Sequence, residues 1–405
     1  MVNIAVLGYG TVGSGVVEVL NTNKESIGKK AGDEIQIKYV LDLRDFPGDP
    51  IQNKIVHDID IILNDEDIKI VVEAMGGIEP AYTFVKRALL GKKSVCTSNK
   101  ELVAKHGPEL LDMARERDIN FLFEASCGGG IPIIRPLNSS LTADEIDEIT
   151  GILNGTTNYI LTKMDKDGSS FEEVLKDAQE KGYAERNPEA DVEGHDACRK
   201  IAILSSLAFG NSVHYEEIYT EGIINITSED ILYAKELGWA IKLLASSKKE
   251  GDSFYAMVAP FLLNKEHPLY NVHGVFNGIF IHGNVLGDAM FYGSGAGKLP
   301  TASAVVADVV DCAKHLHRTV MSYWSSKKLH LTSIEEAKRR FFVRAKGARE
   351  ELVSNIENIF GKVDIVQVPS LKGELGFITS LISEKEYKEK EEKLEGMISR
   401  IRIMD

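Results

Sequence analysis

The sequence predicts an α/β protein in which a doubly wound parallel sheet is followed by an α+β domain and by a C-terminal βαββαβ unit. Over the first third of the chain, short apolar runs alternate with helical patterns, which is typical of a parallel sheet with right-handed crossovers. In the middle third, predicted hairpin strands and clustered helices replace that alternation. The last segment, from about residue 340, shows a third pattern, in which strands and helices are expected in the order βαββαβ. Because 405 residues are too many for one ordinary core, we expect two or three domains.

The parallel sheet is predicted to begin with residues 2–8 (VNIAVLG), an apolar run without a polar face. Such a run is expected of a strand that is buried on both sides. A helix follows from Gly13. Further strands are expected at 35–43, 68–75, 94–97 and 119–124, and further helices at 80–91 and 108–117. The alternation ends near Pro132, where a second domain should begin.

The remaining elements follow from hydrophobic periodicity and turn residues. The second domain is expected to hold strands at 148–153 and 254–260, a hairpin of 275–283 and 285–291, and helices at 171–182, 195–209 and 228–237. Residues 298–323 are predicted to form one long helix that returns to the first domain. After a polar run at 325–328, strands are expected at 340–346, 363–369, 375–383 and 398–403, and helices at 348–360 and 384–397. This last order is that of a ferredoxin-like split unit.

Composition and charge exclude several classes of protein. A hydrophobic content of 43% and a charged content of 27% are typical of a folded soluble protein. The net charge of −14 argues against a nucleic-acid partner, which needs clustered lysine and arginine. No apolar run approaches the ~20 residues of a membrane span, and the chain enters its first strand without a secretory signal. The cysteines are scattered without zinc-binding spacing, so we expect a cytoplasmic protein with reduced thiols.

A dinucleotide site is predicted where the first strand ends. Gly8-Tyr9-Gly10-Thr11-Val12-Gly13 fits the pattern GxGxxG, follows a strand and opens a helix, which is the context that a Rossmann-type turn requires. The glycines allow a tight turn, close approach of the pyrophosphate and close packing of the helix on the strand. The candidate cofactor residues in this turn are Gly8, Gly10, Thr11, Val12 and Gly13.

Polar residues after later strands are candidates for the same ligand. Asp42 could hold the ribose 2′-hydroxyl of NAD, whereas Arg44 could hold the 2′-phosphate of NADP; a solvated ion pair is the alternative. Thr97, Ser98 and Lys100 lie at or just after the end of a predicted strand, and the carboxyl ends of strands face the ligand crevice in such folds. Lys100 could equally be an ordinary surface lysine.

Two stretches farther along have an unusual composition. The loop 124–132 (EASCGGGIP) contains three glycines, which either free the backbone to face a ligand or make a hinge between domains. The second stretch holds Glu185, Asp191, Asp196 and Lys200. Asp196 and Lys200 are four residues apart on a predicted helix, so they share a face and could form a surface ion pair. Several carboxylates around one amine also suit a substrate that carries an ammonium group and a reacting hydroxyl.

Two polar turns complete the candidates. Thr156, in the turn Gly155-Thr156-Thr157-Asn158, could receive a polar substrate or belong to a helix N-cap. Gly295, in the sequence GSGAGK before the predicted return helix, could approach the nicotinamide side of the cofactor or merely turn the chain.

Six motifs taken together resemble those of homoserine dehydrogenases, and the resemblance covers nearly the whole chain. The motifs are GYGTVG, TSNKELVA, EASCGGGIPII, GILNGTTNYIL, GYAERNPEADVEGHDACRK and GSGAGKLPTASAVVADV. The resemblance implies oxidation of L-homoserine to L-aspartate 4-semialdehyde with NAD or NADP, physiologically in reverse. No kinase half is present in the sequence, so the monofunctional type of enzyme is expected, acting in threonine, methionine and isoleucine biosynthesis.

The resemblance also implies roles for individual residues. Lys200 would exchange the hydroxyl proton of the substrate, and Asp196 would orient that chemistry. Glu185 would bind the substrate amino group, with Asp191 nearby in the same role. Lys100 would lie in the crevice that receives the cofactor and the substrate.

A sodium-like cation and a regulatory unit are implied in the same way. The cation would be held by Glu124 and by the backbone carbonyls of Cys127, Gly129 and Ile131. Cys127 departs from the commoner valine, which a backbone ligand tolerates. The C-terminal unit resembles ACT domains, for which threonine is the usual effector, or it could be a packing module without a ligand. Pairing two copies would cover its free edges, so we expect a homo-oligomer, either a dimer or a tetramer.

The expected organisation assigns 1–133, completed by the helix 298–323, to a dinucleotide-binding domain. Residues 134–297 form a substrate-binding and dimerisation domain, and 335–405 form the ACT-like unit. A rival reading as an aspartate-semialdehyde dehydrogenase needs a nucleophilic cysteine with a histidine partner, and Cys127 has no histidine close in sequence. A second rival, a ligand-sensing protein with an inactive dehydrogenase domain, is disfavoured by the intact set of polar residues around Lys200.

Overall fold

The computed structural model describes residues 1–320 and 324–404. The chain divides into two compact units, each assembled from separated segments. Unit 1 comprises Met1–Ile146, Ala202–Tyr215 and Gly293–Leu329, and unit 2 comprises Asp147–Ile201, Glu216–Tyr292 and His330–Asp405. The C-terminal segment, which the sequence suggested as a third domain, is therefore part of unit 2.

Unit 1 contains a six-stranded sheet in which all neighbouring strands are parallel. The strands are β1 (Val2–Leu7), β2 (Ile35–Leu41), β3 (Ile55–Val56), β4 (Ile68–Glu73), β5 (Ser94–Thr97) and β6 (Phe121–Leu122). Their order is β3-β2-β1-β4-β5-β6, and the reversal between β1 and β4 is the point at which doubly wound sheets bind nucleotides. The predicted α/β fold is confirmed.

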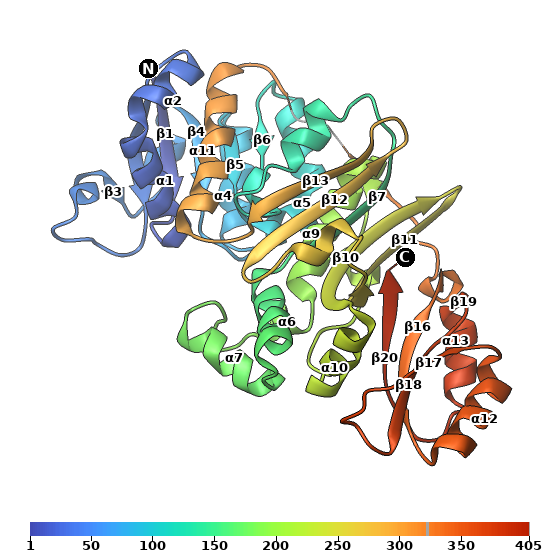
Figure 1. Ribbon diagram of the computed structural model, residues 1–405. Coiled ribbons are helices and arrows are strands. Elements are labelled where there is room, and N and C mark those ends of the chain that lie inside the picture. The colour runs from blue at the N-terminus through green and yellow to red at the C-terminus, as the bar shows by residue number, and fades with distance from the viewer. Residues whose placement is uncertain (321–323, 405) are drawn as a thin grey trace. The chain divides into compact units, whose positions relative to one another are not determined.

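Helices cover this sheet. They are α1 (Thr11–Thr22), α2 (Lys24–Ala31), α3 (Ile59–Leu63), α4 (Ala81–Leu90), α5 (Lys100–Arg115) and α11 (Lys298–Lys314). α11 packs against α1 and against β4 and β5 (Figure 1). A short parallel pair, β8 (Asn211–Ser212) and β14 (Ser325–Lys328), belongs to the same unit.

The predicted return helix is confirmed in position but not in length. Apolar side chains of α11 pack in the same core as those of β1, β2, β4 and α1. It ends at Lys314 rather than at 323. His317 has a positive φ of 63°, a conformation that a right-handed helix does not accommodate. Residues 321–323, the end of the predicted helix, lie outside the described residues.

Helix α5 begins earlier than predicted. Asn99 caps it, with its side-chain oxygen accepting the N–H of Leu102 at 3.1 Å. Pro108 lies inside the helix, although proline favours the first helical turn because it lacks an N–H. That preference explains why the sequence suggested a start at residue 108.

Unit 2 contains a ten-stranded sheet. Its main order is β13-β12-β7-β10-β11-β20-β16-β18-β17, and β9 pairs with β11 off this path. The strands are β7 (Ile146–Ile152), β9 (Tyr219–Thr220), β10 (Ala240–Glu250), β11 (Ser253–Leu263), β12 (Phe276–Gly283), β13 (Gly287–Ser294), β16 (Phe341–Lys346), β17 (Asp364–Val366), β18 (Glu374–Ile378) and β20 (Met397–Met404). The predicted hairpin is confirmed as β12 and β13.

The helices of unit 2 are α6 (Gly155–Asp167), α7 (Phe171–Glu180), α8 (Glu189–Val192), α9 (His195–Phe209), α10 (Ser228–Leu237), α12 (Arg349–Phe360) and α13 (Glu384–Glu391). α9 continues into unit 1 from Ala202. Two short strands, β15 (Lys338–Arg339) and β19 (Ile382–Ser383), form a separate antiparallel pair.

Strand β10 is absent from the sequence prediction, although it forms an unbroken antiparallel ladder with β11. Lys242 interrupts its apolar run and suggests a solvated face. In the structure this lysine is buried. Its ammonium group donates to Asn158 Oδ1 at 3.1 Å and to the Val272 carbonyl at 2.5 Å, so the strand can lie in the core.

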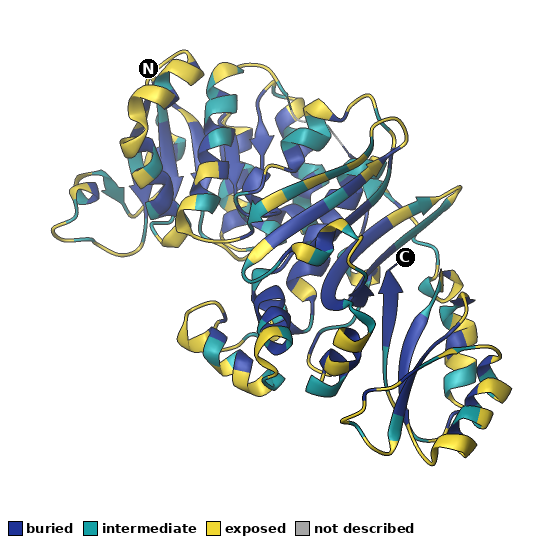
Figure 2. Ribbon diagram, viewed as in Figure 1, coloured by how far each residue is buried: buried dark blue, intermediate teal, exposed yellow. Residues whose placement is uncertain are grey.

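The C-terminal segment has the predicted βαββαβ order, formed by β16, α12, β17, β18, α13 and β20. The last helix is shorter than predicted, because α13 ends at Glu391. β20 also pairs in parallel with β11, with Arg402 opposite Phe261. One sheet therefore continues into this segment, its strands largely buried and its helices exposed on their outer faces (Figure 2).

Among residues 1–320 and 324–404, there is no helix with the length and apolar character needed to cross a membrane.

Candidate functional site

The glycine turn after β1 has the geometry of a phosphate-binding turn. Gly8 has a φ of +94°, which residues with a side chain rarely adopt. A Cβ on Gly13 would collide with the Gly8 carbonyl oxygen. Gly10 precedes α1 without a side-chain cap, and a Cβ built there would meet nothing within 4 Å. The N-terminus of α1, which begins with Thr11 and Val12, can therefore receive an anionic group.

Asp42 and Arg44 lie together beside this turn. The N–H of Tyr9 donates to Asp42 Oδ2 at 2.8 Å, and Arg44 Nε and Nη2 donate to the same carboxylate at 3.0 and 3.1 Å. The hydrogen bond from Arg44 holds the pKa of the Asp42 carboxyl well below its usual range, against the opposing effect of burial. An acceptor for a ribose hydroxyl and a cation for a phosphate thus stand side by side.

A buried polar network lies at the carboxyl ends of β4 and β5. Glu73 accepts the Thr97 hydroxyl at 2.5 Å and two backbone N–H groups of the following turn at 2.7 and 3.2 Å. Burial raises the pKa of the Glu73 carboxyl. Ser98 and Lys100 follow this network, and Lys100 is the first residue of α5. Glu73 was not predicted from the sequence, although an acidic residue at the end of an apolar run was an available signal.

The triple-glycine loop packs against the segment that precedes α11. Gly129 has a φ of +57°, and a Cβ there would run into the Gly295 carbonyl oxygen. The N–H of Gly130 donates to the Ser294 carbonyl at 3.0 Å. Close packing of two backbones within unit 1 therefore explains Gly129 and Gly130.

Glu124 fits poorly as a side-chain ligand of a cation. Its carboxylate is buried and accepts the backbone N–H groups of residues 133–135 at 2.6, 2.8 and 2.7 Å. These bonds occupy most of its lone pairs. Residues 133–135 lie in the first segment of unit 1, Met1–Ile146.

The remaining predicted cation donors are backbone carbonyls, those of Cys127, Gly129 and Ile131. In the part of the chain that the structure describes, no group of three or more Asp, Glu, His or Cys side chains is placed to hold a metal ion. A cation at this loop would therefore depend on carbonyl oxygens, which suit hard cations.

Lys200 and Asp196 form a buried pair on α9. Lys200 Nζ donates to Asp196 Oδ2 at 2.6 Å and to the Leu153 carbonyl at 2.8 Å. The two residues are 9% and 5% exposed, so the alternative of a surface ion pair is wrong. A buried pair of charges persists only when further hydrogen bonds compensate for lost hydration, and Leu153, after the end of β7, supplies one of them.

Asn154 joins this pair to Asp191. Its Nδ2 donates to Asp191 Oδ1 at 2.7 Å and to Asp196 Oδ2 at 2.9 Å. Its Oδ1 accepts the N–H of Thr157 at 2.9 Å and so caps α6. Burial raises the pKa of the Asp191 carboxyl, the hydrogen bond from Asn154 lowers it, and the charge of Asp196 raises it. Asn154 was not predicted from the sequence, although asparagine at the start of a helix is a common N-cap.

Thr156 and Glu185 belong to the edge of this cluster. The Thr156 hydroxyl donates to the Tyr183 carbonyl at 2.7 Å, which ties the loop around residues 182–188 to the start of α6. Glu185 is exposed, whereas Asp191 is partly buried beside Asn154. Of the two carboxylates predicted to bind an ammonium group, Asp191 is the one joined to the lysine pair.

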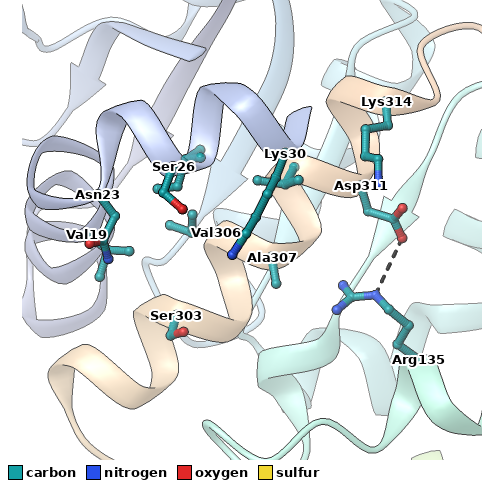
Figure 3. A pocket seen from close by; sticks show the side chains of 12 residues that line it. Val19, Asn23, Ser26, Lys30, Arg135, Ser303, Val306, Ala307, Asp311 and Lys314 are labelled. Atoms are coloured by element: carbon teal, nitrogen blue, oxygen red, sulfur yellow. Dashed lines mark ion pairs between the residues drawn. The ribbon is translucent and has the colours of Figure 1, made fainter. Parts of the chain in front are cut away.

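A cavity of about 660 Å³ lies elsewhere in unit 1, between α1, α2 and α11 (Figure 3). Arg135 Nε lies 3.5 Å from Asp311 Oδ2 in its wall, and Lys30 extends into the space between the helices. Of the residues that the structure describes, none of the predicted site residues lines this cavity. Its size alone therefore gives no reason to place the chemistry there.

Comparison with known proteins identifies one family over both units. The family described as "Homoserine dehydrogenase" matches residues 132–310, and "Homoserine dehydrogenase, NAD binding domain" matches residues 8–124. A homoserine dehydrogenase of Bacillus subtilis is 43% identical over 322 residues, which cover 78% of this chain and 73% of the relative.

Solved structures agree with these sequence matches. A homoserine dehydrogenase from Thiobacillus denitrificans matches with a TM-score of 0.91 and 35% identity, over 100% of this chain and 98% of the other. A hyperthermophilic archaeal homoserine dehydrogenase in complex with NADPH matches with a TM-score of 0.65 and 28% identity, over 77% of this chain and 97% of the other.

Proposed function

The chain belongs to the homoserine dehydrogenase family, and on that premise we propose which of its residues bind and transform the substrate. The enzyme is an oxidoreductase that interconverts L-homoserine and L-aspartate 4-semialdehyde with a nicotinamide dinucleotide, a step in threonine, methionine and isoleucine biosynthesis. The buried Lys200–Asp196 pair beside Asp191 is the observation that carries the residue assignment. The rival nucleophile, Cys127, is fully buried.

Lys200 is the catalytic base for the oxidation of homoserine. As a neutral amine, Nζ accepts the proton of the substrate hydroxyl, and proton transfer of this kind contributes about 10²–10⁴-fold to the rate. Asp196, 2.6 Å away, stabilises the ammonium group that results. In the reverse direction, the same ammonium group returns the proton to the aldehyde oxygen.

Asp191 and Glu185 bind the substrate ammonium group. Asn154 donates to Asp191 at 2.7 Å, so the Asp191 carboxylate can bind a ligand in a fixed orientation. Glu185, on an exposed loop, would close on the ligand from outside. Thr156 positions that loop through its bond to Tyr183, and its hydroxyl can also accept a hydrogen bond from the substrate.

NAD or NADP binds at the glycine turn of unit 1. The N-terminus of α1 would hold the pyrophosphate, and Asp42 or Arg44 would hold the ribose. Thr97, Ser98 and Lys100 lie at the carboxyl end of β5, where Lys100 would contact cofactor or substrate, and Gly295 would lie on the nicotinamide side. The bound dinucleotide would supply the acceptor for the hydride of the carbon that bears the hydroxyl.

A monovalent cation, if held at the glycine loop, would bind the backbone carbonyls of Cys127, Gly129 and Ile131. Glu124 would take part through its backbone rather than its engaged carboxylate. Replacing sodium by a bulky organic cation in the assay tests this proposal, and an unchanged rate would contradict it.

The C-terminal βαββαβ segment is proposed to be an ACT-like regulatory unit with threonine as its effector. Titrating threonine against the initial rate tests the effector, and a flat response would refute it.

The exposed apolar residues Phe276, Met290 and Tyr292 lie on the edge strand β13 and its neighbour β12. They support a dimer or tetramer, since such edges and patches favour pairing.

We also propose that the enzyme works in the cytoplasm. The Cys96 and Cys312 sulfurs lie 3.6 Å apart in the core, well beyond the ~2.05 Å of a disulfide, as expected for reduced thiols.

Initial rates with L-homoserine and either NAD or NADP, measured side by side, test the proposed chemistry. If no activity is measured with NAD or with NADP, the proposed chemistry is wrong.

A further inference from the structure

Glu221 is a charged residue that the reaction does not use. It follows β9, and its Oε2 accepts hydrogen bonds from Arg402 Nη1 at 2.8 Å, from the Tyr219 hydroxyl at 2.9 Å and from Arg400 Nη1 at 3.2 Å. Both arginines come from β20, the last strand of the chain. The Arg402 side chain is only 1% exposed and also pairs with Glu384 at 2.5 and 2.9 Å. Burial and these bonds hold the Arg402 guanidinium in place.

The segment around Glu221 supports the turn that carries Asp191. The N–H of Glu221 donates to the Val258 carbonyl on β11 at 2.8 Å, and the N–H of Ile223 donates to the Val192 carbonyl at 2.8 Å. Between them, Gly222 lies so close that a Cβ there would collide with the Val192 carbonyl oxygen. Val192 immediately follows Asp191 in α8.

The same segment also contacts the start of the catalytic helix. A Cβ on Gly194 would lie 3.2 Å from Thr220 Cγ2 and 3.1 Å from Val258 Cγ1. Gly194 immediately precedes α9, whose first turn contains Asp196. Residues 220–223 therefore form a platform beneath the turn 192–194, which lies between the two aspartates of the cluster.

We propose that Glu221, Arg400 and Arg402 are positioning residues for Asp191, so that the last strand of the chain sets the geometry of the substrate-binding carboxylate. This inference rests on the proposed role of Asp191. The arginines fix the Glu221 carboxylate, Glu221 fixes the platform, and the platform fixes the α8–α9 turn. A displacement of ~1 Å at a binding group can cost about 10²-fold in rate. A small displacement of the platform should therefore weaken substrate binding by Asp191.

A similar ion pair elsewhere in the C-terminal segment provides the matched control. Arg344 on β16 is equally buried, and its Nε and Nη2 bind Glu374 on β18 at 3.2 and 3.0 Å. Arg344 also reaches Asp230 on α10 at 2.8 Å. Glu374→Gln removes one carboxylate charge from a buried arginine, as Glu221→Gln does, but at a site away from the turn 192–194.

The experiment compares kcat, KM and thermal stability of the two variants with those of the wild-type enzyme, using L-homoserine and saturating cofactor. Glu221→Gln should raise the KM for homoserine about tenfold while kcat stays within about twofold, because weakened ammonium binding is largely uniform between ground and transition states. Calorimetry of homoserine binding should show the same loss of affinity. Glu374→Gln should lower thermal stability with the KM for homoserine unchanged.

An unchanged KM in Glu221→Gln, or an equal rise in both variants, would overturn the positioning role. Should Glu221→Gln fail to fold, Arg400→Gln carries the same test, because the Arg400 side chain is 21% exposed and Arg402 still pairs with Glu221. Arg400→Lys should restore part of the affinity. Failure of the wild-type enzyme to turn over homoserine would instead contradict the proposed function, so the two failures are distinguishable.

Discussion

Asn154 is expected to set the ionisation of the substrate-binding carboxylate, and Asn154→Ser tests this. Serine is as good an N-cap as asparagine, so the start of α6 is preserved. The substitution removes the two N–H groups that now donate to Asp191 at 2.7 Å and to Asp196 at 2.9 Å. What changes is therefore the environment of two carboxylates, with little change in the helix that carries the residue.

The size of the effect follows from the hydrogen bond that is lost. A hydrogen bond to a charged group contributes about 1.5–3 kcal/mol, and Asp191 is only partly buried, so the lower end applies. One pKa unit corresponds to about 1.4 kcal/mol, and the pKa of Asp191 should therefore rise by about one unit. Burial already raises this pKa, and the bond from Asn154 opposes the rise.

The assay is the affinity for homoserine, measured by calorimetry as a function of pH, because turnover of homoserine also needs neutral Lys200 and would not isolate Asp191. Asp191 binds an ammonium group only when ionised, so the affinity is lost as pH falls through the pKa of Asp191. In Asn154→Ser, this acidic limb of the affinity profile should move to higher pH by about one unit. Asn158→Ser is the matched control, because Asn158 is also buried on α6 but donates to the Val272 and Phe276 carbonyls. An acidic limb that stays in place in Asn154→Ser, or moves equally in both variants, would refute the reasoning.

Three further predictions concern binding and stability. Glu185→Ala should raise the KM for homoserine more than it lowers kcat, since ammonium binding is largely uniform; an unchanged KM would leave Asp191 as the ammonium site. Arg44→Ala should weaken NADP binding in calorimetry and spare NAD; equal losses would contradict its contact with a 2′-phosphate. Burial lowers the pKa of Lys242 from 10.5 to about 8. The unfolded chain thus binds more protons between these values, and the free energy of unfolding should rise with pH there. Denaturant unfolding of Lys242→Met should lack this contribution, and parallel pH profiles would contradict it.

Five strands of the parallel sheet, β1, β2, β4, β5 and β6, were predictable because each lies in a short apolar run, and a glycine motif at the first turn identifies the nucleotide edge. The two-residue strand β3 was not predicted. The same reasoning failed at β10, where one buried lysine resembles a solvated residue. The end of α11 was also misplaced, because histidine adopts a positive φ more often than most residues but still only in a minority of cases, so His317 gave only a weak signal.

The site was predictable in its residue types but not in its connections. The spacing of Asp196 and Lys200 placed them on one helix face, but whether that face is buried depends on strands far away in the chain. Asn154 lies 37 and 42 residues from the two aspartates that it joins, a distance over which no local pattern operates. The Glu124 carboxylate accepts three hydrogen bonds from the backbone of residues 133–135. These bonds could not be predicted either, because they depend on how the loop folds.

Turnover of L-homoserine by Lys200→Ala tests the central claim most directly. The wild-type enzyme and the variant should be compared in the same assay of nicotinamide reduction, with cofactor affinity measured by calorimetry. A catalytic base contributes about 10²–10⁴-fold, so kcat should fall by at least about 10²-fold while the Kd for the cofactor stays within a few-fold. A variant that keeps more than about a tenth of the wild-type kcat would contradict the assignment of Lys200 as the base.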